Sequence, residues 1–82
     1  MGLSKVKLSA SMKEVIKKMR EGNKLYKYTG KLPSLIIYEN SDIKIPERVF
    51  NSLFSAKIIT VYDAMAFETW YNLTQLGQTI KL

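Results

Sequence analysis

The stretch WYNLTQLGQTI, residues 70–80, decides how this chain completes its fold. It opens with aromatic residues that favour a β-strand, and Thr74 then stands where the hydroxyl of a helix N-cap is expected. Leu76 and Ile80 follow four residues apart, which is the spacing of one apolar helix face. We therefore predict a strand over 67–73 that leads directly into a short helix opened by Thr74.

The residues before this ending predict a partner strand and, before it, a helix. Residues 58–62, Ile-Ile-Thr-Val-Tyr, are the most β-prone run of the chain, and residues 63–66 supply a turn. Pro46 suits the first position of a helix, where its missing N–H would be unpaired in any case. Four apolar residues then repeat at helical spacing: Val49, Phe50, Leu53 and Phe54. We predict that this helix ends near residues 56–57.

The opening of the chain predicts another helix, over residues 10–21. Its apolar face consists of residues at helical spacing: Met12, Val15, Ile16 and Met19. Ser11 and Glu14 match a capping box, and Ser9 is a rival N-cap. Gly22 follows, and a glycine there tolerates the left-handed geometry in which many helices end.

Two further β-favouring segments follow this helix and predict a hairpin. Residues 25–29 and 35–38 flank a turn at residues 30–31. Residues 43–45 predict either a short strand or an extended lead-in to the next helix. The predicted fold is α+β, in the order helix, hairpin, helix, hairpin, helix.

The chain from residue 45 to residue 80 resembles the closing half of a winged-helix domain. Two short motifs carry the resemblance, LFSAKII at residues 53–59 and YNLTQLG at residues 71–77. In that family a helix leads into a two-stranded wing, whose last strand runs into Leu-Thr and a glycine. The resemblance implies a nucleic-acid-binding ancestry and makes the helix over residues 46–56 the recognition-like helix.

The likeness departs from the family at one place. Where the family has a second helix, this chain has a Tyr- and Ile-rich hairpin over residues 25–38. Such degenerate winged-helix domains are similar to small proteins carried by phages and other mobile elements, some of which bind proteins rather than DNA.

Composition limits the classes of function. The 82 residues suit one domain over residues 1–82, in which we expect residues 1–8 to be a flexible basic start. The chain has no cysteine or histidine, so we expect no metal and no cofactor. Without a nucleophile motif or a Gly-rich phosphate loop, we expect no enzyme activity. No apolar run reaches the roughly 18 residues of a membrane span, and no secretion signal is evident, so we expect a cytoplasmic protein without a membrane partner.

Positive charge is concentrated in the first part of the chain. Residues 1–31 carry +7 and residues 32–82 carry −1, within a net charge of +6. A phosphate backbone requires repeated cations more than exact spacing, because affinity comes largely from counterion release. The candidate phosphate-binding residues lie on the first helix and the first hairpin: Lys13, Lys17, Arg20, Lys24, Lys27 and Lys31. The alternative is that these cations only keep a small apolar domain soluble.

Two residues of the recognition-like helix are candidates for base contact. Arg48 and Asn51 carry the donors and acceptors that match guanine and adenine edges in a major groove. The outward side of this helix is nearly neutral, however, and it has no neighbouring phosphate-binding lysines in this interpretation.

Aromatic residues offer a further candidate surface. Tyr26 and Tyr28 alternate with lysines, as in a platform that stacks unpaired bases. Strand alternation puts both tyrosines on one sheet face, and we favour packing in the core for that face. Trp70 and Tyr71 must point to opposite faces, so at least one of them anchors the core.

The leading hypothesis is a small non-enzymatic nucleic-acid-binding or regulatory protein whose basic face lies on the first helix and first hairpin. Binding to two-fold duplex sites would imply a homodimer. The alternative is a protein-interaction module, such as a phage or mobile-element inhibitor or adaptor that binds a host nucleic-acid enzyme.

Overall fold

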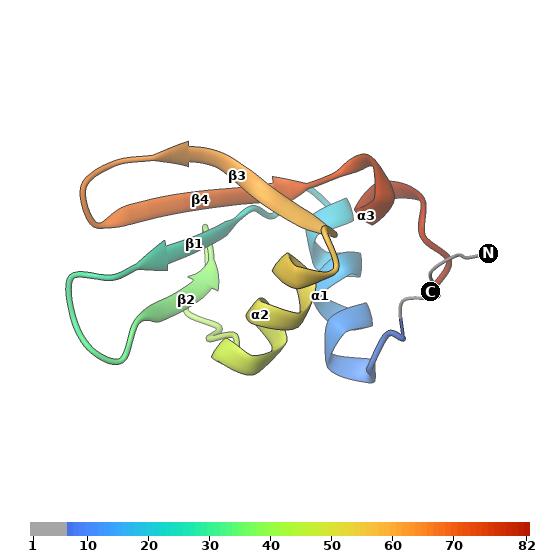
Figure 1. The fold of residues 1–82 in the computed structure, drawn as a ribbon, viewed down its shortest axis with the longest axis horizontal. Helices are drawn as coiled ribbons and strands as arrows, with labels where there is room; N and C mark the ends of the chain where they lie inside the picture. The colour runs from blue at the N-terminus through green and yellow to red at the C-terminus, as the bar shows by residue number, and fades with distance from the viewer. Residues whose placement is uncertain (1–6) are drawn as a thin grey trace.

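Among residues 7–82, four antiparallel strands form one sheet along one side of the fold (Figure 1). The structure is a computed structural model that describes residues 7–82, so residues 1–6 of the start expected at residues 1–8 lie outside the described part. Of that start, Leu8 is half-buried and packs against the core. The strands are β1 (Leu25–Tyr28), β2 (Leu35–Tyr38), β3 (Ile59–Ala64) and β4 (Glu68–Leu73).

The strand order across the sheet is β2-β1-β4-β3. β1 therefore lies between β2 and β4, and Leu25 pairs with Tyr38 on one side and with Tyr71 on the other. The α+β class predicted from the sequence is confirmed. The predicted order differs from this arrangement, because it treats the two strand pairs as separate hairpins whereas the structure joins them through β1 and β4.

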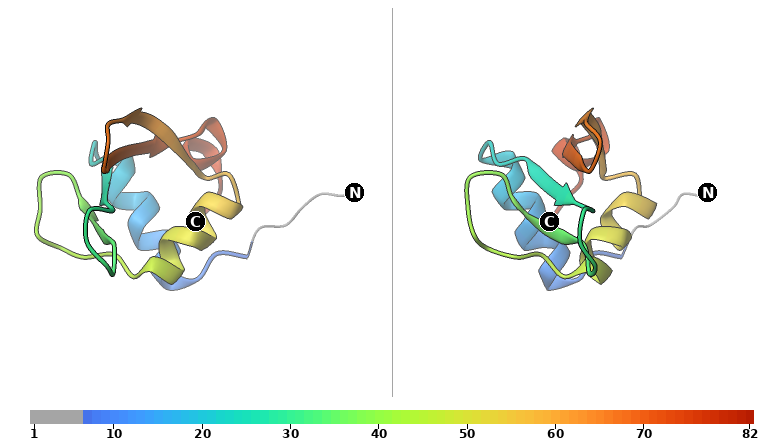
Figure 2. Two further views of the ribbon diagram at one scale, coloured as in Figure 1. Left: turned by 60° about the vertical axis from the view of Figure 1, so that its left-hand side comes forward. Right: turned by 90° about the vertical axis from the view of Figure 1, so that its left-hand side faces the viewer.

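Two longer helices lie together on one side of this sheet, as Figures 1 and 2 show. They are α1 (Ala10–Arg20) and α2 (Glu47–Ser55), and a short third helix, α3 (Gln75–Thr79), follows β4. Their apolar faces and the near face of the sheet enclose one core. Its largest fully buried side chains come from every layer: Ile16, Leu25, Leu53, Ile58 and Ile59.

The ends of α1 follow from local hydrogen bonding. Ser9 is the N-cap, and its hydroxyl accepts the N–H of Met12 at 3.2 Å. The capping box expected from Ser11 and Glu14 is therefore wrong, and the rival cap is the one used. The helix ends at Arg20, and Gly22 follows with φ at 109°, a left-handed geometry that glycine adopts without strain.

Segment 43–45 and α2 adjoin the edge of the sheet. Lys44 forms a single bridge with Ile37, and the Ile45 N–H donates to the Ile36 carbonyl at 2.8 Å, so the segment is an extended lead-in that covers the edge of β2. Pro46 is the N-cap of α2 and not its first residue, so the helix begins one position later than predicted.

The chain passes from α2 into the β3–β4 ribbon through Lys57, which has φ at 61°. β3 then continues to Ala64, so two residues predicted as a turn belong to the strand. The register shifts between Val61 and Asp63, which marks a β-bulge. β3 therefore begins one residue later and ends two residues later than predicted, and β4 begins one residue later.

Thr74 opens α3, as predicted. Its hydroxyl oxygen accepts the Gly77 N–H at 3.2 Å and lies 2.6 Å from the Lys57 carbonyl and 3.1 Å from the Ile58 carbonyl. The single hydroxyl proton can serve one of these two carbonyls at a time. One side chain thus links the start of α3 to the start of β3. Among residues 7–82, no helix combines the length and apolar character needed to cross a membrane.

Candidate nucleic-acid interface

The side of α2 that faces away from the core is polar. Val49, Phe50 and Leu53 are buried, which fixes the rotation of the helix. Arg48 and Asn51 are consequently exposed, three residues apart on the opposite side. The two predicted base-contact residues therefore lie where a partner can reach them.

Lys27 brings a cation to α2 from the neighbouring sheet. In β1 it pairs with Ile36, which is 2% exposed, so its side chain lies on the helix side of the sheet. Its ammonium group is 4.8 Å from the centre of the Phe50 ring. Phe54, which is 47% exposed, stacks beside Phe50 with ring centres 6.2 Å apart. A cation–π contact of this kind holds a positive charge beside α2, on the side of the helix that faces the sheet.

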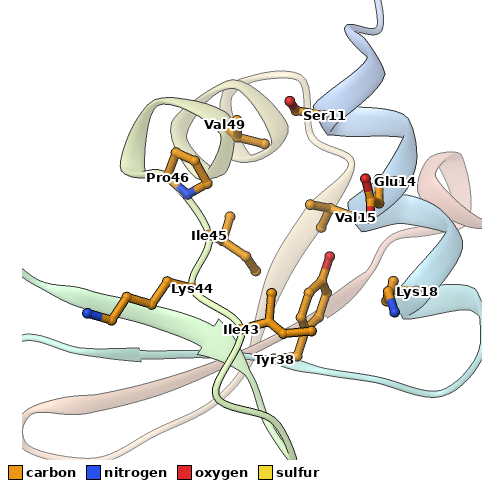
Figure 3. Close-up of a pocket in the computed structure, with 10 residues that line it drawn as sticks. All are labelled: Ser11, Glu14, Val15, Lys18, Tyr38, Ile43, Lys44, Ile45, Pro46 and Val49. Atoms are coloured by element: carbon orange, nitrogen blue, oxygen red, sulfur yellow. The ribbon is translucent and has the colours of Figure 1, made fainter.

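Two further lysines flank α2 along the chain. Lys44 lies two residues before Pro46 and Lys57 lies two residues after Ser55, and both lysines are exposed. Figure 3 shows the Lys44 side chain directed away from the neighbouring groove. Neither lysine was among the predicted residues. Their position at the ends of a recognition-like helix was the sequence signal that could have identified them.

The lysines of α1 lie beside carboxylates of the same region of the chain. Lys13, Lys17 and Lys18 line a shallow depression on this helix together with Glu14 and Glu21. Lys13 and Lys17 are exposed, as predicted. The two carboxylates offset most of the charge of the three lysines, so this surface attracts phosphates only weakly.

Arg20 is held by the other end of the chain. Its guanidinium donates to the Gly77 carbonyl from Nε at 3.1 Å and from Nη2 at 3.0 Å, and Nη2 also donates to the Ile80 carbonyl at 2.6 Å. These carbonyls lie in and just after α3, where a cation also complements the helix dipole. Arg20 therefore secures α3, a role that the sequence analysis did not foresee.

The remaining two predicted lysines lie elsewhere. The Lys24 ammonium is 5.1 Å from the centre of the Tyr62 ring in β3, and Lys31 is exposed in the β1–β2 loop. Strand alternation from Lys27 places Lys24 on the opposite side of the sheet. The structure therefore distributes the eight predicted residues over several surfaces and places only Lys27, Arg48 and Asn51 on or beside α2, with Lys27 on its sheet-facing side.

The tyrosines of β1 lie on the outer face of the sheet, away from α1 and α2. Tyr26 pairs with Trp70, and their ring centres are 5.4 Å apart. The preference for core packing of Tyr26 and Tyr28 is therefore wrong, because Leu25 and Lys27 occupy the inner positions of this strand. Trp70 and Tyr71 do point to opposite faces, with Tyr71 in the core.

A groove of about 230 Å³ separates α1 from the segment before α2 (Figure 3). Val15, Ile45 and Val49 supply its apolar lining, and the Tyr38 hydroxyl points into it. Burial, and then the Glu14 carboxylate, raise the pKa of Tyr38. The groove therefore presents the Tyr38 hydroxyl, together with Ser11 at its border, on an otherwise largely apolar lining.

Among residues 7–82, no group of three or more His, Cys, Asp or Glu side chains is placed to hold a metal ion. Comparisons with protein families, with curated proteins and with solved structures find no match to this chain. The proposed function therefore rests on the geometry of the residues of this chain.

Proposed function

We propose that this chain is a small non-enzymatic nucleic-acid-binding or regulatory protein that uses α2 as its reading element. The observation that carries this proposal is the Lys27 ammonium 4.8 Å from the Phe50 ring. In this proposal Lys27 is the cation next to α2 that would contact a phosphate. Lys44 and Lys57 add charge at the two ends of the same helix.

The chemistry of the exposed side of α2 suits a duplex major groove. Arg48 can donate two hydrogen bonds to the O6 and N7 of guanine, and Asn51 can pair with the N6 and N7 of adenine. Lys27, Lys44 and Lys57 would contact the phosphates, which fix the register but carry no sequence information. Lys13 and Lys17 of α1 are supplementary phosphate contacts in this proposal.

The proposal includes a winged-helix-like origin of the degenerate kind. α2 leads into the β3–β4 ribbon, which is the wing of this interpretation, and β4 runs into the Thr74 cap of α3. The β1–β2 hairpin stands in place of a second helix. Two copies bound to a two-fold site would form a homodimer on the nucleic acid.

The direct test compares duplex DNA, single-stranded DNA and RNA by fluorescence anisotropy at 50 and 150 mM salt. We expect duplex DNA to bind best. The three main phosphate contacts, Lys27, Lys44 and Lys57, should alone weaken that binding about twentyfold for a threefold rise in salt, from a slope of about 0.9 per phosphate, and contacts from α1 would add to this. Binding that is insensitive to salt, or absent for all three probes, would contradict the proposal.

A matched pair of variants localises the interface. Lys27→Gln should lower the salt slope by about one. Lys24→Gln makes the same charge change on the other side of the sheet and should leave the slope unaltered. Equal effects of the two substitutions would assign binding to net charge alone.

A second candidate function rests on apolar side chains at one end of the molecule. Leu32, Met65 and Phe67 are 92%, 66% and 59% exposed. The Thr29 N–H donates to the Phe67 carbonyl at 2.9 Å and joins the two loops that carry them. Such a patch suits a protein-interaction module that binds a host nucleic-acid enzyme. Capture of one protein from nuclease-treated lysate, lost in a Leu32→Ser/Phe67→Ser variant, would favour this role.

A further inference from the structure

The outer face of the sheet carries a set of aromatic side chains that no helix of the described residues covers. Tyr26 and Trp70 are cross-strand partners on this face, with ring planes inclined at 51°. Tyr62, at the bulge of β3, is 58% exposed. Figure 1 shows α1 and α2 on the opposite side of the strands.

These rings present the negative faces of their π systems, which attract cations. One such contact already exists within the molecule, since the Lys24 ammonium lies 5.1 Å from the centre of the Tyr62 ring. The Tyr26 and Trp70 rings have no cation of this kind among the described residues. Their half-buried position leaves part of each ring open to a partner.

Carboxylates accompany these aromatic rings. Glu68 pairs with Tyr28 and Asp63 pairs with Trp70, so both acids share the outer face with the rings. Burial, and then the nearby Glu68 carboxylate, raise the pKa of Tyr26. Two lysines also border this face: Lys24 lies one residue before β1 with its ammonium at Tyr62, and Lys44 bridges Ile37 beyond β2. Tyr26 and Trp70 instead have the two carboxylates as their strand neighbours, which opposes a phosphate and favours a cation at these two rings.

We propose that the outer face of the sheet, defined by Tyr26, Tyr62, Asp63, Glu68 and Trp70, docks an extended arginine- or lysine-bearing segment of a protein partner. A guanidinium can stack on an indole or phenol ring while it pairs with a neighbouring carboxylate. Lys27, Arg48 and Asn51 lie on the other side of the sheet from these rings, so both surfaces can be occupied together.

The net charge of +6 does not prevent this docking. Exposed charges separated by more than about 8 Å are largely screened at physiological ionic strength. The exposed lysines of α1 belong to the helix layer on the other side of the sheet, so they act weakly on this face. The two carboxylates, beside the rings, determine the local attraction.

Trp70 provides a direct measurement, because it is the single tryptophan of the chain. The unaltered protein is titrated with a nonapeptide of alternating Gly and Arg, with a matched peptide of Gly and Glu, and with single-stranded oligo-dT. We expect Trp70 emission to change with the Arg peptide alone. This response should weaken as salt rises from 50 to 500 mM.

Charge variants then test the role of the acids. Asp63→Asn and Glu68→Gln should each weaken binding of the Arg peptide about two- to fivefold, the range measured for exposed ion pairs. Glu14→Gln and Glu21→Gln make the same charge change on α1 and should leave the affinity unaltered. Thermal unfolding midpoints confirm that each variant is folded.

Three results would overturn the docking proposal: no response to the Arg peptide, an equal response to the Glu peptide, or a response to oligo-dT in its place. The salt dependence of Arg-peptide binding to the unaltered protein tests the docking proposal even if a variant fails to fold. Duplex binding by α2 is measured separately, so failure of one proposal does not imply failure of the other.

Discussion

Arg20 and Gly77 lie 57 positions apart and are joined by two hydrogen bonds from one guanidinium to one carbonyl, at 3.0 and 3.1 Å. This fork ties the last turn of α1 to α3. A helix of five residues is too short to be stable alone, so α3 depends on such tertiary contacts.

Replacement of Arg20 should therefore loosen α3. We expect Arg20→Ala to lower the free energy of unfolding by about 1–2 kcal/mol, which is the lower part of the range for hydrogen bonds to charged groups, because the site is partly exposed. Arg20→Lys keeps the charge and loses the fork, and should recover only part of this loss. Urea denaturation measures both. Lys17→Ala, on the same helix, is the control and should stay within about 0.5 kcal/mol of the parent.

Gly77 is constrained by its neighbours. A Cβ atom there would lie 2.5 Å from the Ile58 carbonyl oxygen and 2.8 Å from Leu73 Cδ2. We expect Gly77→Ala to lower the free energy of unfolding by about 1–3 kcal/mol through overpacking, partly offset by the better helix propensity of alanine. Gln78→Ala, at the next and exposed position, should cost little in the same denaturation experiment. A Gly77→Ala protein as stable as the parent would show that α3 is not packed this closely.

Thr74 has two structural roles through one hydroxyl. Thr74→Ala removes the N-cap and should cost about 1–2 kcal/mol. Thr74→Ser keeps the hydroxyl and should lie much closer to the parent in thermal unfolding. If the alanine and serine variants unfold at the same temperature, the Thr74 hydroxyl does not stabilise the fold.

Two buried tyrosines predict a decline of stability in alkali. Burial raises the pKa of Tyr38, with the Glu14 carboxylate adding to the effect, and burial also raises the pKa of Tyr71. An unfolded tyrosine ionises near pH 10, below its folded counterpart, so this contribution is complete below about pH 10 and is lost as pH rises through the folded values. Urea unfolding from pH 8 to 11.5 should show this decline. A Tyr38→Phe/Tyr71→Phe variant should show a shallower one, and an identical slope would contradict the assignment.

Arg48 and Lys44 should affect binding in different ways. Arg48→Ala should cost about 1–3 kcal/mol on a preferred duplex and relax the preference at one base pair. Lys44→Gln should weaken binding by a similar factor on every duplex, because a phosphate contact carries no sequence information. Selection from a randomised duplex pool followed by anisotropy separates these outcomes. An unaltered base preference in Arg48→Ala would remove that residue from the reading role.

Much of the local structure could be predicted from short sequence patterns. The apolar residues of α1 and α2 repeat at helical spacing, and Thr74 and Gly22 act at the helix ends where their chemistry predicts. Sequence patterns could not decide whether Ser9 or Ser11 is the N-cap of α1. Both serines stand near the first turn, and the rotation that buries Met12 decides which hydroxyl reaches a free N–H.

The candidate interfaces were harder to predict, because a strand has two faces and its sequence does not say which one is covered. Tyr26 and Lys27 are neighbours in β1, yet the tyrosine lies outside and the lysine lies beside Phe50. That assignment follows from the pairing of β1 with β4, a contact between residues more than forty positions apart. The hydrogen bonds of Arg20 likewise depend on a long-range contact, because the Gly77 and Ile80 carbonyls are far from Arg20 in the sequence.

The β3–β4 ribbon is anchored at one end and open at the other. The Ile58 carbonyl accepts the Thr74 N–H at 2.9 Å, whereas Met65 at the far end is 66% exposed. Insertion of two residues into each strand near that far end would preserve the inward and outward alternation of every existing side chain. The length of this ribbon can therefore change between related sequences while the anchored end, and the packing beneath it, stay the same.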